Sequence, residues 1–411
     1  MKRRILFLLL FCIGLFSLVS FSSCSDDSED VDDYNKQTVL VFMPWSGSSS
    51  SSGLYNYFLA NIDSIESAIK TAKGNTGRVL VFISNSAESS DLYEITYEKG
   101  QVRHMPLKTY DGNIYTTADG IASILNDVKT YAPALNYAMI IGCHGSGWTY
   151  KEDWTNYPYG AKRLLLGNQK SNQTPTPPYP ITRFYGSVSD NNYATNIPTL
   201  AEGIATAGIK MQYILFDDCY MANVETAYEL RNVTNFLIGS TSEVMGVGMP
   251  YQTMWSSLAS ATPNYTTAAN DFYKFYSNYN YPYGGLSVVD CRKMDNLASC
   301  MKAINDHFTF DETQRDSLQA LDGFNTHLFY DLGDYVAHLC QNTDLLNDFN
   351  SALSSAIKAT VHTDQLYSYI YLSGPRLINV KHYSGLTISD PSVNSVAVKG
   401  KEKTAWWTAT H

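Results

Sequence analysis

Two short apolar runs, each ending abruptly in polar residues, constrain the fold of this chain more than any other feature. The first covers residues 137–143 and is followed by His144, and the second covers residues 212–216 and is followed closely by Cys219. Continuous apolar runs of this length are typical of parallel strands that are buried on both faces of a sheet. Ligands bind at the carboxyl ends of such strands, so we expect His144 and Cys219 to meet there.

A histidine and a cysteine at neighbouring strand ends can act together on a carbonyl carbon. A thiol attacks as the thiolate, and it needs a base within hydrogen-bonding distance, which the fold rather than the sequence brings close. Residues after Cys219 keep helical spacing as far as Arg231, so we also expect a helix to begin near Cys219, where its dipole would stabilise a thiolate. A lone cysteine is more often buried and inert. The matching position of His144 favours a catalytic role for Cys219.

The segment before His144 predicts the rest of the sheet. Apolar runs at residues 39–43 and 78–83 predict two further strands, and residues 54–73 between them have apolar positions at helical spacing. A second helical pattern, at residues 117–131, leads into the strand that ends at His144. This alternation of strands and helices predicts an α/β fold with a mostly parallel central sheet between layers of helices.

The length and pattern of the chain predict two parts after the N-terminal segment. Residues 37–256 would form the domain that carries His144 and Cys219, and residues 257–411 a C-terminal α+β subdomain packed on it. Residues 150–196 are a long irregular insert with lysines, arginines and a proline-rich stretch. Loops of this length within a domain are lids, binding loops or disordered segments.

The N-terminus carries signals for export. Residues 1–23 have a basic start and an apolar run too short for a transmembrane helix, which is typical of a signal peptide. The stretch Phe-Ser-Ser-Cys that ends at Cys24 resembles the processing box of bacterial lipoproteins, in which the cysteine is lipidated. Residues 24–36 are acidic and predict a solvated tether, which resembles that of cell-surface lipoproteins of the Bacteroidetes type. The alternative is an ordinary secretory peptide with Cys24 incidental.

Charge and cysteine content exclude several classes of function. The net charge is −10 with no basic cluster, which argues against nucleic acid as a partner and suits basic partners better. The cysteines beyond Cys24 are scattered, so they predict neither a disulfide framework nor a zinc site. We expect membrane contact only through an N-terminal lipid anchor.

Several motifs together resemble the clostripain-like cysteine peptidases, which share a clan with caspases, gingipains and legumain. The first is His-Gly-x-Gly-Trp at residues 144–148, and the second is Phe-Asp-x-Cys-x-Met followed by Glu-x-Ala-Tyr-Glu-Leu within residues 216–230. The third is Ser-x-x-Glu followed by Gly-x-Pro-Tyr within residues 240–251. The resemblance runs from about residue 39 nearly to the C-terminus and implies a caspase-like α/β/α sandwich.

The resemblance implies a role for each matching residue. His144 would be the general base and acid, and Cys219 the nucleophile that forms a thioacyl intermediate. Backbone N–H groups of Gly145 and Cys219 would hold the oxyanion. Asp217 would line the pocket for the residue before the cleaved bond and pair with Arg or Lys there.

Two departures from the family pattern leave questions open. Asp218 stands where a small residue is usual; it either faces the same pocket and strengthens the preference for a basic residue, or packs elsewhere against a partner. The resemblance also implies maturation by cleavage between the histidine and the cysteine, which would fall in residues 150–196. No cofactor is required by the sequence and no metal ligands are assigned; the resemblance allows calcium, although no calcium-loop spacing is present.

The sequence therefore predicts a cysteine endopeptidase that cleaves proteins or peptides after Arg or Lys, as an outer-membrane or cell-surface lipoprotein of a Gram-negative bacterium. Two alternatives remain. One is a non-catalytic surface lipoprotein that binds a glycan or a host protein through aromatic loops. The other is a peptidase of the same fold with a different specificity.

Overall fold

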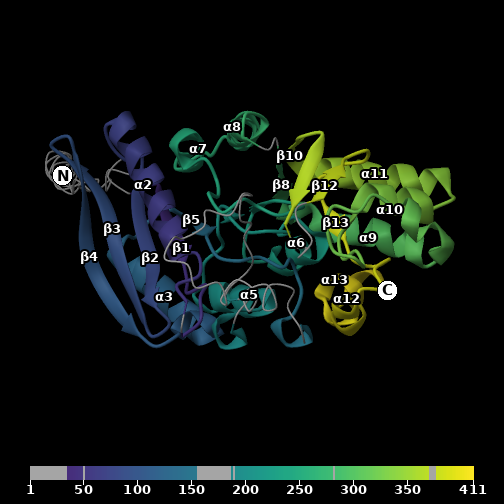
Figure 1. The fold of residues 1–411 in the computed structure, drawn as a ribbon, viewed down its shortest axis with the longest axis horizontal. Coiled ribbons are helices and arrows are strands. Elements are labelled where there is room, and N and C mark those ends of the chain that lie inside the picture. The colour runs from purple at the N-terminus through teal and green to yellow at the C-terminus, as the bar shows by residue number, and fades with distance from the viewer. Residues whose placement is uncertain (1–34, 50, 155–186, 188–189, 281–282, 370–375) are drawn as a thin grey trace, which may run out of the picture. The chain divides into compact units, whose positions relative to one another are not determined.

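A mixed sheet of nine strands forms the centre of the protein in a computed structural model (Figure 1). The structure describes residues 35–49, 51–154, 187, 190–280, 283–369 and 376–411. The strand order is β10-β8-β7-β6-β5-β1-β2-β3-β4. The five middle strands are parallel: β2 (Arg78–Ser86), β1 (Gln37–Met43), β5 (Asn136–Ile141), β6 (Ile214–Phe216) and β7 (Phe236–Gly239).

Antiparallel strands extend the sheet at both edges. On one side β3 (Ser89–Glu98) and β4 (Gln101–Asp111) form a hairpin next to β2. On the other side β8 (Gly285–Asp290) pairs with β7, and β10 (Ile357–His362) pairs with β8. Because β8 and β10 lie beyond residue 256, the two predicted parts of the chain share one sheet.

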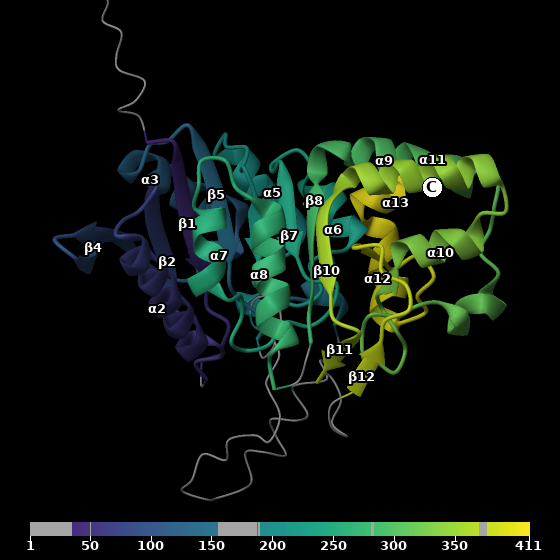
Figure 2. The ribbon, with the colours of Figure 1, turned by 90° about the horizontal axis from the view of Figure 1, so that it is seen from above.

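Helices cover both faces of the sheet, as Figures 1 and 2 show. One layer consists of α2 (Tyr55–Ala72), α7 (Tyr251–Leu258) and α8 (Tyr265–Ser277). The opposite layer contains α3 (Ala118–Tyr131), α5 (Ile197–Thr206) and α6 (Val224–Leu230), followed by α9 (Met294–Asn305), α11 (Thr343–Ala356) and α13 (Ala405–Thr410). This α/β/α arrangement is the predicted fold class.

The side-chain alternation of the strands explains why two cores form. In β1, Leu40 and Phe42 belong to the core under α3 and α5, whereas Val39, Val41 and Met43 belong to the core under α2. Successive side chains of a strand point to opposite faces, so a run that is apolar at every position must be buried on both. The uninterrupted apolar runs therefore predicted the layered architecture correctly.

Smaller elements make up the rest of the secondary structure among the described residues. Two short sheets pair β9 (Tyr330–Asp331) with β13 (Thr387–Ile388), and β11 (Gln365–Ser368) with β12 (Arg376–Asn379). Two further helices are α10 (Leu332–Leu339) and α12 (Ser395–Gly400). Short 3-10 turns occur at Ile114–Thr116, Lys151–Asp153, Asn191–Tyr193, Cys291–Lys293, Glu312–Ser317 and Lys401–Lys403.

Some sequence predictions lie outside the described residues. They are the signal peptide at residues 1–23, lipidation of Cys24, nearly all of the acidic tether at residues 24–36, and most of the insert at residues 150–196. Among the helices of the described ranges, none has the length and apolar character needed to cross a membrane. The domain boundary at residue 256 stays a prediction.

Candidate active site

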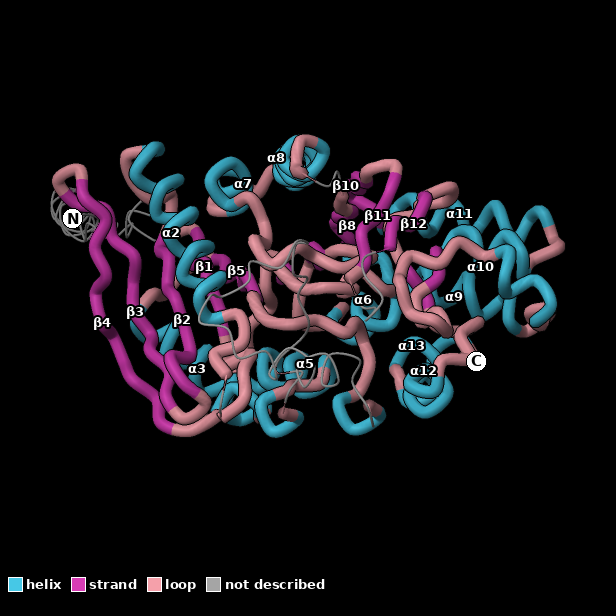
Figure 3. Tube along the Cα trace, viewed as in Figure 1, coloured by secondary structure: helices cyan, strands magenta, loops and turns pink. Residues whose placement is uncertain are grey.

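The pairing of β5 with β6 determines where the two predicted reactive residues lie. Ile141 is in register with Phe216, and the Asp217 N–H donates to the Ile141 carbonyl at 2.8 Å. Because these strands are parallel, the segments that carry His144 and Cys219 leave the sheet at the same edge. Figure 3 shows loop segments filling the middle of the view, between α7 and α8 on one side and α5 on the other.

The backbone of Gly145, the residue after His144, lies directly against the backbone of Cys219. A Cβ atom at Gly145 would lie 2.3 Å from the Cys219 carbonyl oxygen and 2.7 Å from its nitrogen, so only glycine fits. The Cys219 side chain is buried, whereas His144 is partly exposed. The fold therefore brings together the two strand ends that the sequence singled out.

The Cys219 sulfur receives a backbone hydrogen bond. The Val244 N–H, from the loop after β7, donates to Sγ at 3.2 Å. The thiol donates in turn to the Val244 carbonyl at 3.8 Å, so the backbone of Val244 fixes the position of the sulfur. The helix expected near Cys219 is α6, but it begins only at Val224, where the Asn223 side chain caps it. The donor near the sulfur thus comes from a loop.

Tyr220, which follows the nucleophile candidate, holds an uncommon backbone conformation. Its φ is +59°, in the left-handed region that a bulky residue rarely adopts. The Tyr220 N–H donates to the Ser242 carbonyl at 2.8 Å, and the ring stacks on Phe329 with centroids 4.9 Å apart. The Tyr220 hydroxyl donates to the buried carboxylate of Glu243 at 3.0 Å. These contacts hold the strained turn that presents Cys219.

Glu243 connects this turn to the C-terminal part of the chain. Besides the Tyr220 hydroxyl, it accepts a hydrogen bond from the Ser368 hydroxyl and one from the Tyr369 N–H at 3.1 Å. Sequence reasoning did not assign a role to Tyr220 or Glu243. The signal for Glu243 was present, since it is the glutamate of the Ser-x-x-Glu motif.

Asp217 and Asp218 are both buried and lie against different segments. Asp217 accepts hydrogen bonds from the Met249 N–H at 3.0 Å and from the Tyr251 hydroxyl at 2.9 Å, so it faces the loop between β7 and α7. Asp218 accepts a hydrogen bond from the Cys143 N–H at 2.6 Å. Of the two alternatives for Asp218, these contacts correspond to the one in which it packs away from Asp217 against a partner.

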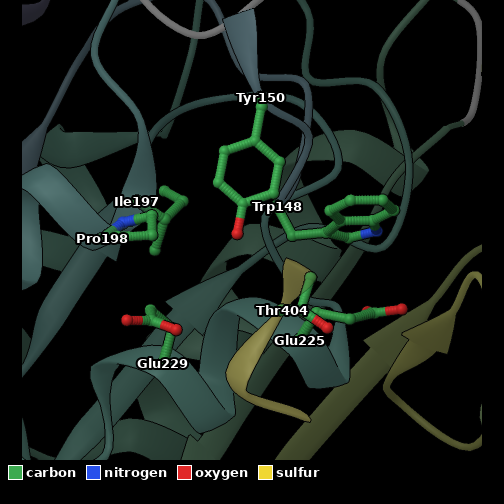
Figure 4. A pocket seen from close by; sticks show the side chains of 7 residues that line it. All are labelled: Trp148, Tyr150, Ile197, Pro198, Glu225, Glu229 and Thr404. Atoms are coloured by element: carbon green, nitrogen blue, oxygen red, sulfur yellow. The ribbon is translucent and has the colours of Figure 1, made fainter. Parts of the chain in front are cut away.

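A small cavity of about 10 Å³ lies behind the His-Gly-x-Gly-Trp motif, with room for about one water molecule. Figure 4 shows Trp148 and Tyr150 on one side of it and the carboxyl groups of Glu225 and Glu229 on the other. The Trp148 indole N–H donates to the Ser389 hydroxyl at 2.8 Å. The C-terminal segment thus supports the first motif directly.

Glu225, which lines this cavity, interacts with a second buried carboxyl group, Asp390. Burial raises the pKa of Glu225 to about 8, and the negative charge of Asp390 adds to this effect. Burial also raises the pKa of Asp390 to about 7, while the Lys401 ammonium opposes the shift. One oxygen of each carboxyl group has no hydrogen-bond partner among the described residues. Both carboxyl groups therefore stay protonated at pH values well above those at which an exposed carboxyl group loses its proton.

The buried Cys219 thiol accepts a backbone hydrogen bond and lies next to the segment that carries His144 after β5. On a sheet of this topology, such an arrangement is typical of a cysteine peptidase. Within the described ranges, no group of three or more His, Cys, Asp or Glu side chains is placed to hold a metal ion, and the described cysteines form no disulfide.

Comparison with known proteins identifies the family. The sequence-family model that describes the clostripain family matches residues 180–390 of this chain. The solved structure of iotapain, a secreted C11 cysteine protease from Bacteroides thetaiotaomicron, is 41% identical with a TM-score of 0.81, covering 92% of this chain and 99% of that chain. The chain therefore belongs to the clostripain family and is a cysteine peptidase, a hydrolase. No curated protein matches it.

Two further structures are similar. A clostripain from Bacteroides thetaiotaomicron in complex with the peptide inhibitor BTN-VLTK-AOMK is 46% identical with a TM-score of 0.53, covering 56% of this chain and 99% of that chain. An inactive zymogen C11 protease from Parabacteroides distasonis is 22% identical with a TM-score of 0.74, covering 92% of this chain and 99% of that chain, and shows likeness of fold alone.

The Tyr220–Glu243 contact yields a prediction about catalysis. Tyr220→Phe keeps the ring that stacks on Phe329 and removes the hydrogen bond to Glu243. We expect kcat for peptide hydrolysis to fall about tenfold while KM changes by less than about twofold, because the turn that carries Cys219 is held less well. Steady-state kinetics would measure this, with Tyr273→Phe on the exposed side of α8 as the matched control. A change in KM alone would contradict a positioning role.

The buried carboxyl pair yields a prediction about pH. Glu225 has a pKa of about 8 when folded against an ordinary value of 4.5, so in this window the folded protein holds a proton that the unfolded chain has released. The free energy of unfolding should therefore decrease as pH rises from about 4.5 to about 8. Denaturant titrations should give a flatter profile for Glu225→Gln and an unaltered one for the exposed Glu202→Gln. An equally steep decrease in Glu225→Gln would contradict the assignment.

Proposed function

We propose that this peptidase cleaves peptide bonds after Arg or Lys, with Cys219 as the nucleophile and His144 as general base and acid. The observation that carries this proposal is the contact of Gly145 with the backbone of Cys219, together with the Val244 N–H that donates to the sulfur. This contact sets the backbone that follows His144 against the backbone of Cys219, which supports a role for the imidazole as the base for the thiol.

The reaction would proceed in two stages. In the first, His144 takes the thiol proton, the sulfur attacks the carbonyl carbon of the substrate, and the carbonyl oxygen becomes an oxyanion. The C–N bond then breaks, His144 gives its proton to the leaving amine, and a thioacyl enzyme remains. In the second stage, water attacks the thioacyl carbon with His144 as base, which releases the acid and restores the thiol. The backbone N–H groups of Gly145 and Cys219 would stabilise the oxyanion in both stages.

Asp217 would select the residue before the cleaved bond. Its carboxylate is buried, and it accepts hydrogen bonds from the Met249 N–H and the Tyr251 hydroxyl, which orient it. A carboxylate pairs with the guanidinium of arginine through two parallel hydrogen bonds and with the ammonium of lysine as a point charge. The inhibitor of the clostripain neighbour, BTN-VLTK-AOMK, has lysine as the last residue of its peptide, which supports this preference.

Asp218 would act on the position of His144 rather than on the substrate. Its hydrogen bond from the Cys143 N–H fixes the backbone directly before His144 relative to the nucleophile segment. A charge-assisted hydrogen bond of this kind is stronger than one between neutral groups.

Export, anchoring and maturation belong to the same proposal. Iotapain is described as secreted, which supports export of this chain through residues 1–23. Lipidation of Cys24 would then anchor the enzyme to the outer membrane by its acyl chains alone, with residues 24–36 as the tether. Self-cleavage after a lysine or arginine within residues 150–196 would mature it.

Calcium, which the family resemblance allows, needs several oxygen ligands. In the described part of the chain, no cluster of three or more acidic, histidine or cysteine side chains is placed to hold an ion.

The proposed nucleophile can be tested directly. Cys219→Ala should abolish hydrolysis of a fluorogenic peptide with arginine at the cleaved position, since no other group supplies the attacking sulfur. Labelling by a thiol-directed peptide inhibitor, followed by mass spectrometry, should be lost in the same variant. Cys300→Ala, at the half-buried cysteine of α9, is the matched control and should keep both properties. Hydrolysis retained in Cys219→Ala would refute the assignment.

The proposed specificity residue requires a comparison of substrates. Asp217→Asn preserves the shape of the side chain and removes its charge, so kcat/KM for arginine and lysine substrates should fall about 10- to 100-fold, the range of a charged hydrogen bond. A substrate with glutamine at the same position should be affected far less. If the ratio between basic and neutral substrates were unchanged, the preference would arise elsewhere, as in the alternative of a different specificity.

A further inference from the structure

A groove of about 420 Å³ lies beyond the ends of β1 and β2. The loop after β1 lines one side with several serines, among them Ser48 and Ser51, and Trp45 lies at the start of that loop. The turn between β2 and β3 contributes Glu88, and Tyr193 comes from the 3-10 turn before α5. None of the catalytic roles proposed above uses these residues.

The strand register places this groove beside His144. Phe42 of β1 pairs with Ile141 of β5, and the Gly142 N–H donates to the Phe42 carbonyl at 3.0 Å. Trp45 and His144 each come three residues after this pair, so the register continued beyond the strands would place Trp45 level with His144. Since β1 lies on one side of β5 and β6 lies on the other, the groove and Cys219 are on opposite sides of His144.

The direction of a bound substrate follows from the proposed function, on which this inference rests. Asp217 contacts the loop after β7, so the side chain before the cleaved bond lies on the β6 and β7 side of the site. The leaving amine must reach His144 to receive its proton. The residues that follow the cleaved bond therefore continue past His144, over the ends of β1 and β2.

We propose that the groove between Trp45, Glu88 and Tyr193 is a binding site for the leaving segment of a peptide substrate, and that it prefers a basic residue near its far end. Exposed Glu88 provides the negative charge, and the Tyr193 hydroxyl donates to its Oε1 at 3.5 Å. Tyr193 offers partly exposed aromatic surface, the mostly buried Trp45 forms part of the apolar wall, and the serines offer hydroxyl groups to a peptide backbone.

Strand spacing indicates which substrate residues reach the groove. Neighbouring strands are about 4.8 Å apart, so three spacings from β6 to β2 amount to about 14 Å. An extended peptide advances about 3.3 Å per residue, so about four residues cover this distance. The third residue after the cleaved bond would lie near Trp45 and the fourth near Glu88.

The test uses internally quenched peptides that share one sequence before the cut, with arginine at the cleaved position. One series varies the number of residues after the cut from one to five, and a second places lysine, glutamine or glutamate at the fourth position. We expect kcat/KM to rise when the peptide reaches the third and fourth residues, because remote contacts contribute to transition-state binding. Lysine should be preferred over glutamate about two- to fivefold, the range of an exposed ion pair.

Glu88→Gln should remove the preference for lysine over glutamate, and Glu98→Gln, at the exposed far end of β3, should leave it intact. Equal rates for all lengths and for all three fourth-position residues would overturn the inference. A separate reporter with arginine followed only by a small fluorophore tests the proposed function alone. If that reporter is cleaved while the long peptides show no dependence, the inference fails and the proposed function stands; if that reporter is not cleaved, the proposed function itself fails.

Discussion

The parallel pairing of β5 with β6 is the interaction on which the rest of the site depends. It sets the ends of both strands at one edge of the sheet, and the approach of Gly145 to the Cys219 backbone completes the contact. Both strands are buried on their two faces, so a shift of register by one residue would move each side chain to the core on the opposite face. It would also separate the segment that carries His144 from the segment that carries Cys219. The core therefore specifies the geometry of the site.

Three buried carboxylates then fix the segment around Cys219, and each accepts a backbone N–H from a different part of the chain. The pairs are Asp217 with Met249, Asp218 with Cys143, and Glu243 with Tyr369. Burying a carboxylate is costly unless such donors replace the lost water. Removing one partner would leave a buried charge uncompensated, so the segment around Cys219 is held by contacts that are each costly to break.

The sequence predicted the parts of this arrangement that depend on local pattern. The apolar runs of β1, β2 and β5 and the helical spacing of α2 and α3 were identified within a few residues, because burial on both faces leaves a visible pattern. The helix after Cys219 was predicted to begin too early, since Tyr220 adopts a left-handed turn that only tertiary contacts to Glu243 and Phe329 sustain. The groove near Glu88 was also missed, because it is assembled from three separate loops and has no sequence signature.

The residues after 256 are structurally tied to the site. They supply β8 and β10 to the sheet, the Tyr369 N–H to Glu243, and the Thr387 N–H to the Ala222 carbonyl at 3.0 Å, close in sequence to Cys219. The Ser389 hydroxyl also accepts a hydrogen bond from Trp148 of the first motif. Without them, Glu243 would lose two of its described donors and β7 would become an exposed edge strand. Whatever boundary divides the chain, the backbone geometry at Cys219 therefore depends on contacts that reach it from more than 100 residues away.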